Sequence, residues 1–514
     1  MMSCTENCTI VLVSLYSSDA IGLRYISSFL KAHGMDVHLI FFKEKYLESD
    51  EMSLPTNKEY QFLLDIISRL QPVVIGVSLR SSFFRIATAI TEKIRKTFGM
   101  PVIWGGTHPN VAPEECIQVS DMICIGEGEH PMLELASQFA KGENVHGIQN
   151  LWIRTEKEII RNPVRAPVQD LDSLPFPDYG HEGKYLIEDD SVSGKDPALG
   201  AFNLNVMGSR GCPYHCSYCC NSVFRQIYKG KGPPVRRRSV DNVLEEIESM
   251  RERFPGLQRI DFIDEVFAWD KSWSMEFTAK YKKRVNLPFQ CAQHPNMVDR
   301  DILEMLTDAG LERVEVGLQS GSERIRREVF ERPVSDDSLL NVAGIISDLK
   351  IIPFYDLIVD NPFETEEDKR RGLEFILQLP RPFHLRMFPL TYFPNTMLTQ
   401  KALASGRISP DQVESKAERT HNKWFVTLDY PWLDGERYWI SLFSLTSKSF
   451  IPKRLIRWLS RIRILSERPQ LLSSFATVAN NIKLGTIAIK WLLEGKPLKS
   501  VFSHARKGRG HWQI

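Results

Sequence analysis

The sequence predicts an α/β protein: a doubly wound parallel sheet at the N-terminus, then a partial (β/α)6 barrel, then a mainly helical C-terminal region. Two series of apolar runs separated by helix-like stretches favour this class, because buried parallel strands are continuous apolar segments. The chain has 514 residues, too many for one hydrophobic core. We place the domains at 1–145, 146–200, 201–400 and 401–514, with 146–200 as a linker.

The first series of apolar runs lies within residues 9–141. In open α/β sheets, ligands bind at the carboxyl ends of the strands. Small, turn-forming residues stand at these ends and let the backbone approach a ligand closely. The expected strands are 10–15, 37–42, 73–79, 102–104 and 122–125, and the ligand-facing candidates are Ser14, Ser78, Gly105, Gly106, Gly126, Glu127 and Gly128.

Residues 146–200 contain several prolines, among them Pro175 and Pro177. A residue that precedes a proline avoids the helical region of backbone space. The segment is therefore expected to be an extended connector.

The second series of apolar runs lies within residues 201–400. Six strand–helix units predict a partial barrel, whose chemistry lies at the carboxyl ends of the strands. A helix is expected at 322–330, among others. The expected strands are 202–206, 259–263, 289–292, 313–318, 352–359 and 384–390.

Composition excludes several classes of protein. The formal net charge is +1, so no overall field favours nucleic acid, and no nucleic-acid partner is expected. No apolar run approaches the ~18 residues of a membrane-spanning helix. The N-terminal apolar run lacks a preceding basic region, so it does not resemble a signal peptide. Nine cysteines, an odd number in a long chain, favour a reducing, cytoplasmic compartment.

Three cysteines follow the first barrel strand directly, at Cys212, Cys216 and Cys219. Thiolates are the ligands of cubane iron–sulfur clusters, and three of them leave the fourth iron open to a small molecule. A zinc site usually needs four ligands. His215 and Cys220 could complete such a set, but both lie too close in sequence for easy tetrahedral closure. The motif therefore indicates a [4Fe–4S] cluster.

This spacing, with Tyr218 before the last cysteine, resembles the signature of the radical S-adenosylmethionine superfamily. The resemblance implies that the open iron binds the amino and carboxylate groups of S-adenosylmethionine. It also implies that one electron, from a donor such as flavodoxin or ferredoxin, cleaves the sulfonium to a 5′-deoxyadenosyl radical. In such enzymes the cofactor supplies the difficult chemistry, and the protein positions it.

Further segments resemble motifs of the same superfamily. An acidic pair follows the second barrel strand, and a segment at 315–322 resembles the motif that contacts adenosine. Asn361 and Asn395 stand where the superfamily usually has glycine, and asparagine tolerates the left-handed backbone. The candidates implied for S-adenosylmethionine are Tyr218, Asp264, Glu265, Glu315, Gln319 and Ser320.

Residues 102–109 and 125–129 resemble the cobalamin-binding domain that precedes the barrel in one large group of these enzymes. The loop after the first strand has no histidine, so the resemblance implies cobalamin bound without histidine ligation. His108 is expected to pack within a loop, and His38 to belong to the second strand. A degenerate domain without cofactor is the alternative. A Rossmann nucleotide site is disfavoured, because no G-x-G-x-x-G follows the first strand.

The C-terminal region is strongly basic, with fourteen Lys and Arg from Lys448 onward against Glu467 and Glu494. Basic and apolar residues alternate at near-helical spacing over 451–465. A helical cap whose basic face meets water is the favoured interpretation. Peripheral contact with an anionic membrane is the alternative.

These features predict a cobalamin-dependent radical enzyme that methylates an unreactive carbon of a small molecule. The same cofactors serve cyclisation or ring rearrangement in related enzymes. A cofactor-binding sensor or assembly protein without turnover is a third hypothesis, which the complete cysteine triad disfavours. A methylthiotransferase is disfavoured because no second cysteine triad is recognisable near Cys116 and Cys124. The sequence assigns no catalytic side chain.

Overall fold

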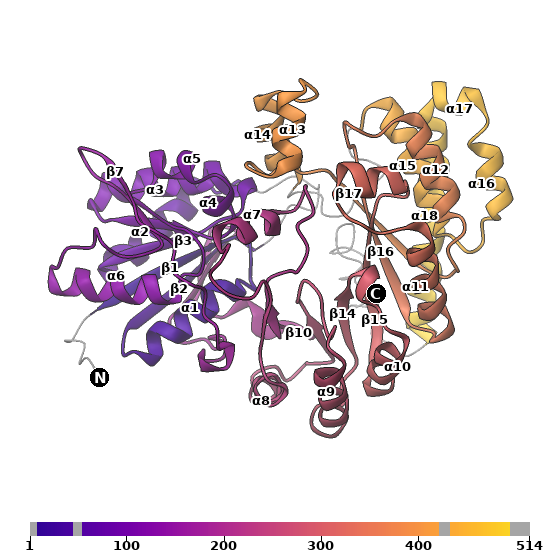
Figure 1. The fold of residues 1–514 in the computed structure, drawn as a ribbon. Coiled ribbons are helices and arrows are strands. Elements are labelled where there is room, and N and C mark those ends of the chain that lie inside the picture. The colour runs from indigo at the N-terminus through magenta and orange to yellow at the C-terminus, as the bar shows by residue number, and fades with distance from the viewer. Residues whose placement is uncertain (1–7, 45–53, 421–431, 494–514) are drawn as a thin grey trace. The chain divides into compact units, whose positions relative to one another are not determined.

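The computed structural model describes residues 8–44, 54–420 and 432–493, and its contacts divide the chain into two compact units (Figure 1). The first comprises the described residues up to Ile260 together with Phe393–Gln400. The second comprises Asp261–Tyr392 and the described residues from Lys401 onward.

The first unit is built on a nine-stranded sheet of order β7-β6-β5-β4-β3-β1-β2-β8-β9. The central strands β1–β5 and β8 pair in parallel, whereas β6, β7 and β9 pair antiparallel at the edges. The strands are β1 Thr9–Leu15, β2 Asp36–Phe42, β3 Val74–Ser78, β4 Val102–Gly105, β5 Met122–Cys124, β6 Leu151–Arg154, β7 Ile159–Arg161, β8 Lys184–Glu188 and β9 Ser191–Ser193.

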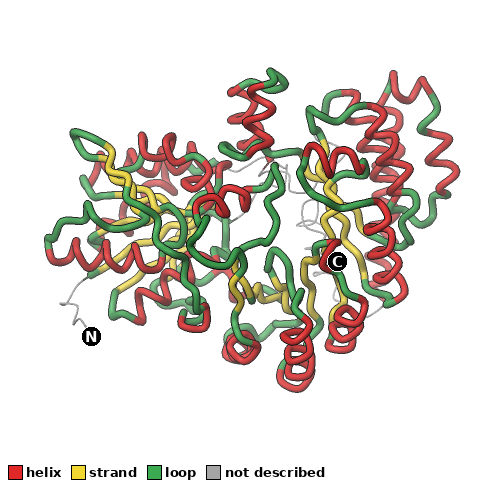
Figure 2. Tube along the Cα trace, in the orientation of Figure 1, coloured by secondary structure: helices red, strands yellow, loops and turns green. Residues whose placement is uncertain are grey.

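Helices cover both faces of this sheet, as Figure 2 shows in red against the yellow strands. Alternate residues of β1 point to opposite faces, Val11 toward one core and Leu12 toward the other. This arrangement confirms the doubly wound fold. α2 Asn57–Leu70, α3 Phe84–Phe98 and α5 Pro113–Val119 pack on one face, and α1 Ile21–Ala32 and α6 Glu129–Lys141 pack on the other; α4 is Thr107–Val111.

The segment 146–200, expected to be a linker, instead supplies the four strands β6–β9 to the nine-stranded sheet. These strands are only three to five residues long, and β6 alternates buried and half-buried residues. Short alternating strands at a sheet edge lack the continuous apolar run of a central strand. Four of its prolines lie between β7 and β8, where the chain has no strand pairing, and Pro197 begins a short turn after β9.

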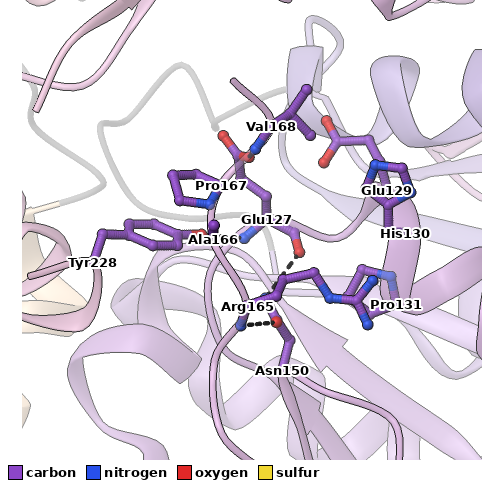
Figure 3. A pocket seen from close by; sticks show the side chains of 10 residues that line it. All are labelled: Glu127, Glu129, His130, Pro131, Asn150, Arg165, Ala166, Pro167, Val168 and Tyr228. Atoms are coloured by element: carbon purple, nitrogen blue, oxygen red, sulfur yellow. Dashed lines mark hydrogen bonds between the residues drawn. The ribbon is translucent and has the colours of Figure 1, made fainter. Parts of the chain in front are cut away.

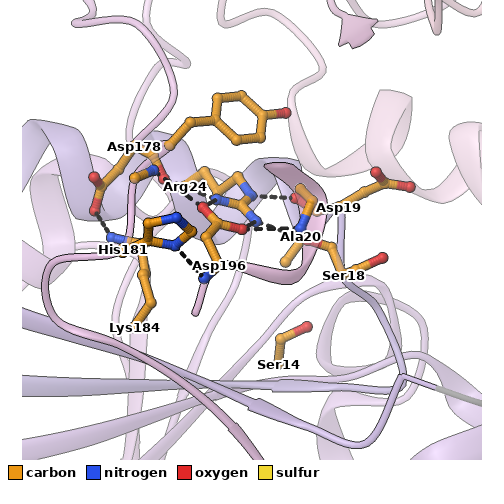
Figure 4. Close-up of polar contacts among 12 residues, drawn as sticks. Ser14, Ser18, Asp19, Ala20, Arg24, Asp178, His181, Lys184 and Asp196 are labelled. Atoms are coloured by element: carbon orange, nitrogen blue, oxygen red, sulfur yellow. Dashed lines mark hydrogen bonds and ion pairs between the residues drawn. The ribbon is translucent and has the colours of Figure 1, made fainter. Parts of the chain in front are cut away.

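A buried ion pair ties this segment to α1 (Figure 4). The Arg24 guanidinium and the Asp196 carboxylate are both fully buried, with N···O distances of 2.6 and 2.7 Å. Arg24 also donates to the carbonyl oxygens of Ser18, at 2.8 Å, and Asp19, at 2.7 Å. These two residues form the loop after β1, so one side chain fixes a loop at the carboxyl edge of the sheet.

The barrel strands form a six-stranded sheet in chain order. The pairings of β14 with β15, β15 with β16 and β16 with β17 are parallel. This order confirms the predicted succession of strand–helix units, although the helix expected at 322–330 is a short π-helical stretch, Ile325–Val329. The elements are β10 Asn203–Val206, α8 Val240–Arg251, β13 Arg259–Phe262, α9 Lys271–Arg284, β14 Phe289–Gln293, α10 Arg300–Ala309, β15 Leu311–Gln319, α11 Asp336–Asp348, β16 Ile352–Val359, α12 Glu366–Ile376 and β17 His384–Pro389.

The C-terminal region is helical where it is described, as predicted. Its central helix α15 is buried continuously from Tyr438 to Thr446, because its residues are apolar or small on all sides. Within residues 8–44, 54–420 and 432–493, no helix has the length and apolar character needed to cross a membrane. The helices are α13 Met397–Ala404, α14 Pro410–Thr420, α15 Asp434–Thr446, α16 Lys453–Leu459, α17 Arg463–Glu467 and α18 Pro469–Leu493.

Replacing Asp196 by asparagine should destabilise the first unit by about 3–5 kcal/mol, because it leaves the Arg24 charge buried without a counter-charge. The free energy of unfolding from urea denaturation measures this loss. Glu114→Gln is the matched control, since its pair with Arg161 is 63% and 44% exposed and should contribute at most about 1 kcal/mol. Equal losses in the two variants would contradict the assigned role.

Candidate cofactor sites

The cysteine loop lies between strand β11, Ser209–Arg210, and helix α7, Cys220–Ile227. β11 pairs antiparallel with β12, Arg236–Arg237, so the start of the loop is held in place. Gly211 has φ +98°, and a Cβ there would lie 2.2 Å from the carbonyl oxygen of Pro234. Only glycine fits this close, left-handed turn.

Backbone contacts shape the rest of the loop. Cys216 is buried, while Cys212 and Cys219 are half-buried. The Cys219 N–H donates to the Cys216 carbonyl at 3.1 Å, and the Arg225 guanidinium donates to the carbonyls of Cys212 and Pro213. Because α7 begins directly after Cys219, the positive end of the helix dipole favours an anionic ligand sulfur there.

The donor set fits an iron–sulfur cluster. In the described part of the chain, no three His, Cys, Asp or Glu side chains gather closely enough to hold a single metal ion. A cubane makes a different demand, because each thiolate binds a different iron and the sulfurs stand farther apart. Three thiols on one clamped loop meet this demand in kind and number, and leave one iron for another ligand.

The register of the first sheet brings three cobalamin candidates together. Ser14 lies opposite Ser78, and Ser78 lies opposite Gly105, so β1, β3 and β4 present one row at their carboxyl ends. A Cβ on Gly105 would meet no atom within 4 Å, so the space above this glycine is open. At Gly106, φ is +93° and a Cβ would lie 2.8 Å from the Leu79 carbonyl oxygen. This row of small residues fits the edge of a large planar cofactor.

Glu127 lies in the Gly126–Gly128 loop after β5, but its carboxylate is engaged with protein groups (Figure 3). It pairs with Arg236 at 2.8 Å and with Arg210 at 3.2 Å, and it accepts from the Val168 N–H at 2.7 Å. Its own N–H donates to the Tyr228 hydroxyl at 2.7 Å. Burial acts to raise the pKa of Glu127, but Arg210 and Arg236 outweigh it and hold the pKa below its ordinary value.

A small cavity adjoins this loop, and it is too small to hold either cofactor. It marks where the loop after β5, the segment at 165–168 and α7 meet. Its lining, drawn in Figure 3, consists of Glu127, Glu129, His130, Pro131, Asn150, Arg165, Ala166, Pro167, Val168 and Tyr228.

The two histidines considered from sequence have structural contacts. His108 is buried, with Nδ1 3.0 Å from the Ser81 hydroxyl and Nε2 3.4 Å from the Glu115 carboxylate. His38 lies in β2, with Nε2 3.1 Å from the Asp36 carboxylate. The placement of His38 agrees with the expectation, whereas His108 lies in the short helix α4 and not in a loop.

The second unit contains most of the S-adenosylmethionine candidates, whereas Tyr218 and the three cysteines belong to the first. Asp264 is buried and Glu265 is exposed, both just after β13. Gln319 ends β15 with φ +64°, and the Ser320 hydroxyl donates to the Glu364 carboxylate at 3.3 Å. The ends of β15 and β16 therefore meet at a polar contact.

Glu315 is held by a side chain that sequence reasoning missed. Arg386 of β17 donates to both carboxylate oxygens of Glu315, at 2.8 and 2.7 Å. It also donates to both oxygens of Asp356, at 2.6 and 2.8 Å. Burial acts to lower the pKa of Arg386, but the two carboxylates outweigh it and raise the pKa above its ordinary value. The signal in the sequence was one charged residue in each of two mainly apolar strands, Asp356 in β16 and Arg386 in β17, which could have indicated an ion pair between them.

Glu364 is a second residue that sequence reasoning did not select. Burial raises its pKa to about 8, the Glu436 carboxylate adds to this, and Lys369 opposes it. A carboxyl group that stays protonated near neutral pH is unusual and marks a candidate functional position. Glu364 lies three residues after Asn361, one of the two asparagines that stand where the superfamily usually has glycine.

Comparison with known proteins identifies two domains. Residues 206–376 match the radical SAM superfamily, and residues 8–136 match the B12 binding domain. The chain is 24% identical over 393 residues to an uncharacterised methyltransferase of Pyrococcus horikoshii, covering 75% of this chain and 78% of the relative. It is 23% identical over 354 residues to the cytidylyl-2-hydroxyethylphosphonate methyltransferase of Streptomyces wedmorensis, covering 61% and 64%.

A third relative has a different reaction in its name. The chain is 22% identical over 266 residues to the anaerobic magnesium-protoporphyrin IX monomethyl ester cyclase of a Synechocystis strain, covering 50% of each protein.

Two solved structures share the fold. The radical S-adenosylmethionine methyltransferase TsrM of Kitasatospora setae, with tryptophan and a SAM analogue bound, superposes with a TM-score of 0.60 at 17% identity, covering 77% of this chain and 76% of TsrM. The cobalamin-dependent radical enzyme OxsB gives a TM-score of 0.58 at 19% identity, covering 80% of this chain and 56% of OxsB. Both likenesses confirm the fold class.

Glu127→Gln should lower the free energy of unfolding at neutral pH by about 2 kcal/mol, because two largely buried arginines lose their counter-charge. The contribution of an ionised carboxylate with a lowered pKa is present above its unfolded pKa and is lost as pH falls through the folded pKa. The difference between wild type and variant should therefore shrink below about pH 4.

Urea denaturation across this pH range measures the difference. Glu134→Gln is the control, because its pair with Arg165 is 43% exposed on the acidic side and should contribute little at any pH. A difference between wild type and Glu127→Gln that does not depend on pH would refute the charge pairing.

Glu364→Gln should show the opposite pH dependence. A group with a raised folded pKa contributes stability below its unfolded pKa and loses it as pH rises through the folded pKa. The ligand-free variant should match wild type near pH 5 and exceed its stability by about 2 kcal/mol above pH 8. Glu367→Gln, at an exposed pair with Arg371, should not gain stability with pH. A difference in the free energy of unfolding between wild type and Glu364→Gln that is the same at every pH would contradict the raised pKa of Glu364.

Proposed function

We propose that this chain, in which residues 206–376 match the radical SAM superfamily and residues 8–136 match the B12 binding domain, is a cobalamin-dependent methyltransferase acting on an unreactive carbon of a small organic molecule. The observation that carries the proposal is that one chain combines a cysteine loop suited to a cluster with a sheet edge suited to cobalamin. The chain holds a clamped three-cysteine loop and a sheet edge of small residues that is open above Gly105. Methyltransferases among the relatives support the reaction class.

When bound, the cluster and the cobalamin supply a low-potential electron and a nucleophilic cobalt. The protein's part is to hold them. Cys212, Cys216 and Cys219 bind the cluster, and Arg225 fixes the loop through its carbonyl contacts. Ser320 and Glu364 shape the polar end of β15 and β16 on which S-adenosylmethionine rests.

Ser14, Ser78 and Gly105 would form the row that holds the cobalamin, and no histidine of this chain would be its ligand. The register supports this placement, because it aligns these three residues at one edge. The burial of His108 and the contact of its Nδ1 with the Ser81 hydroxyl support the absence of a histidine ligand.

A second candidate reaction is cobalamin-dependent cyclisation or ring rearrangement. The similarity to the anaerobic cyclase favours it as the alternative. Product analysis separates the two, because methyl transfer from S-adenosylmethionine leaves S-adenosylhomocysteine, whereas cyclisation does not require it.

The cell compartment and the electron donor complete the proposal. Thiolate ligands and a low-potential cluster need a reducing environment, which favours the cytoplasm. A reduced flavodoxin or ferredoxin supplies the electron.

Anaerobic reconstitution tests the cluster assignment. The protein is loaded with iron and sulfide and reduced with dithionite in the presence of S-adenosylmethionine. We expect about four irons per chain and formation of 5′-deoxyadenosine. Cys212→Ala, Cys216→Ala and Cys219→Ala should each lose cluster and cleavage, whereas Cys220→Ala should keep both. A full cluster in the three variants would refute the ligand set, and cleavage absent from the loaded wild type would favour the sensor hypothesis.

A second variant tests the cobalamin placement. Gly105→Leu places a side chain in the open space over the sheet edge, so the fold should tolerate it while hydroxocobalamin binding is lost. Gly147→Leu is the matched control, because its Cβ also meets no atom within 4 Å. The visible spectrum after gel filtration reports binding, and S-adenosylhomocysteine reports methyl transfer. Retained cobalamin in Gly105→Leu would exclude this edge as the binding site.

A further inference from the structure

Helix α18 presents an apolar face to solvent. Leu471, Phe475, Val478 and Ile482 are 54%, 43%, 56% and 50% exposed. They recur at intervals of four, three and four residues, so they lie on one side of the helix. A folded domain seldom leaves a run of large apolar residues in water without a function.

An adjoining face of α18, about 100° around the helix from the exposed residues, packs on the rest of the fold. Leu472, Ala476 and Ala479 are buried, with exposures of 1%, 0% and 2%. The helix is thus already anchored, while its outward apolar residues keep about half of their surface in water.

The neighbouring helices add apolar and cationic groups. Trp458 of α16 is 59% exposed, and Ile464 of α17 is 52% exposed. Arg454 and Arg461 are also exposed. We define the C-terminal surface as these four residues together with the outward face of α18.

The positive charge of the C-terminal region favours an anionic partner for this surface. From Lys448 onward, fourteen Lys and Arg stand against Glu467 and Glu494. Apolar side chains beside cations are complementary to the interface of an anionic lipid bilayer. A tryptophan beside arginines is typical of this environment, because its ring occupies the headgroup level.

We propose that the C-terminal surface binds the face of a membrane rich in anionic phospholipid. No helix among the described residues can span a bilayer, so the contact is peripheral. The apolar face of α18 enters the headgroup boundary, and Arg454 and Arg461 meet lipid phosphates. This binding is independent of both cofactors and of the reaction.

Two other occupants fit the charge less well. A second copy of the chain would bring two strongly basic regions together, and like charges in contact oppose association. The last residues of this chain would also bring like charges into contact with the surface, because five Lys and Arg follow Glu494.

Flotation of the full-length protein with vesicles tests the proposal. Vesicles of phosphatidylcholine alone are compared with vesicles of phosphatidylcholine and phosphatidylglycerol. We expect binding to the mixed vesicles, and binding should weaken as salt rises because screening shortens the range of the charges. Loss of the cofactors should leave this binding unchanged.

Two sets of variants separate the apolar and ionic contributions. Arg454→Gln with Arg461→Gln should weaken binding about 25-fold, since each cation near an anionic surface contributes about fivefold. Phe475→Asn with Val478→Asn should weaken it about tenfold or more. Met275→Asn is the control, because Met275 on α9 is 54% exposed but lies outside the surface.

Unchanged melting temperatures show that the variants fold. No binding to either vesicle, equal binding to both, or equal binding by all variants would overturn the proposal. A dimer in light scattering that Phe475→Asn with Val478→Asn dissociates, without vesicle binding, would replace it with self-association.

Discussion

The carboxylate of Glu127 is the constraint on which the first unit depends. It joins three segments that are distant in sequence: the loop after β5, the backbone at Val168, and the paired strands that carry Arg210 and Arg236. Arg210 directly precedes Gly211 and the first cysteine of the cluster loop. A largely buried carboxylate between two arginines is costly to separate, because each partner left alone would be an uncompensated charge. The cysteine loop and the glycine-rich sheet edge therefore share one anchor.

The second unit contains a similar ion-pair cluster with the charges reversed. There one guanidinium, Arg386, holds two carboxylates on two neighbouring strands through four hydrogen bonds. The planar fork of arginine suits such paired contacts, and the resulting geometry is rigid. Glu315, expected from the resemblance to contact the substrate cofactor, is thus also a structural partner. Its orientation is set before any ligand binds.

Sequence patterns predicted those features that depend on residues close together in the chain. The apolar runs predicted the central strands, and the spacing of the three cysteines predicted the cluster loop. Asn395 does adopt the left-handed backbone at φ +63°, as expected for a glycine replacement. At the other replacement the positive φ falls on Asp360, and the Asn361 side chain instead accepts from the Phe363 N–H at 3.1 Å. The pairing of Arg24 with Asp196 spans 172 positions, and no local pattern encodes such a contact.

The C-terminal helices show how a sequence pattern can serve two purposes at once. The basic and apolar mixture is compatible with a solvated cap, and the buried face of α18 agrees with that interpretation. Burial of one face, however, explains only the residues that lie on it. The part of an apolar side chain that stays exposed in the folded chain gains nothing from folding, since it meets water before and after it. The proposed membrane contact would remove the remaining apolar surface of Phe475 and Val478 from water, and the exposed Arg454 and Arg461 favour an anionic surface for it.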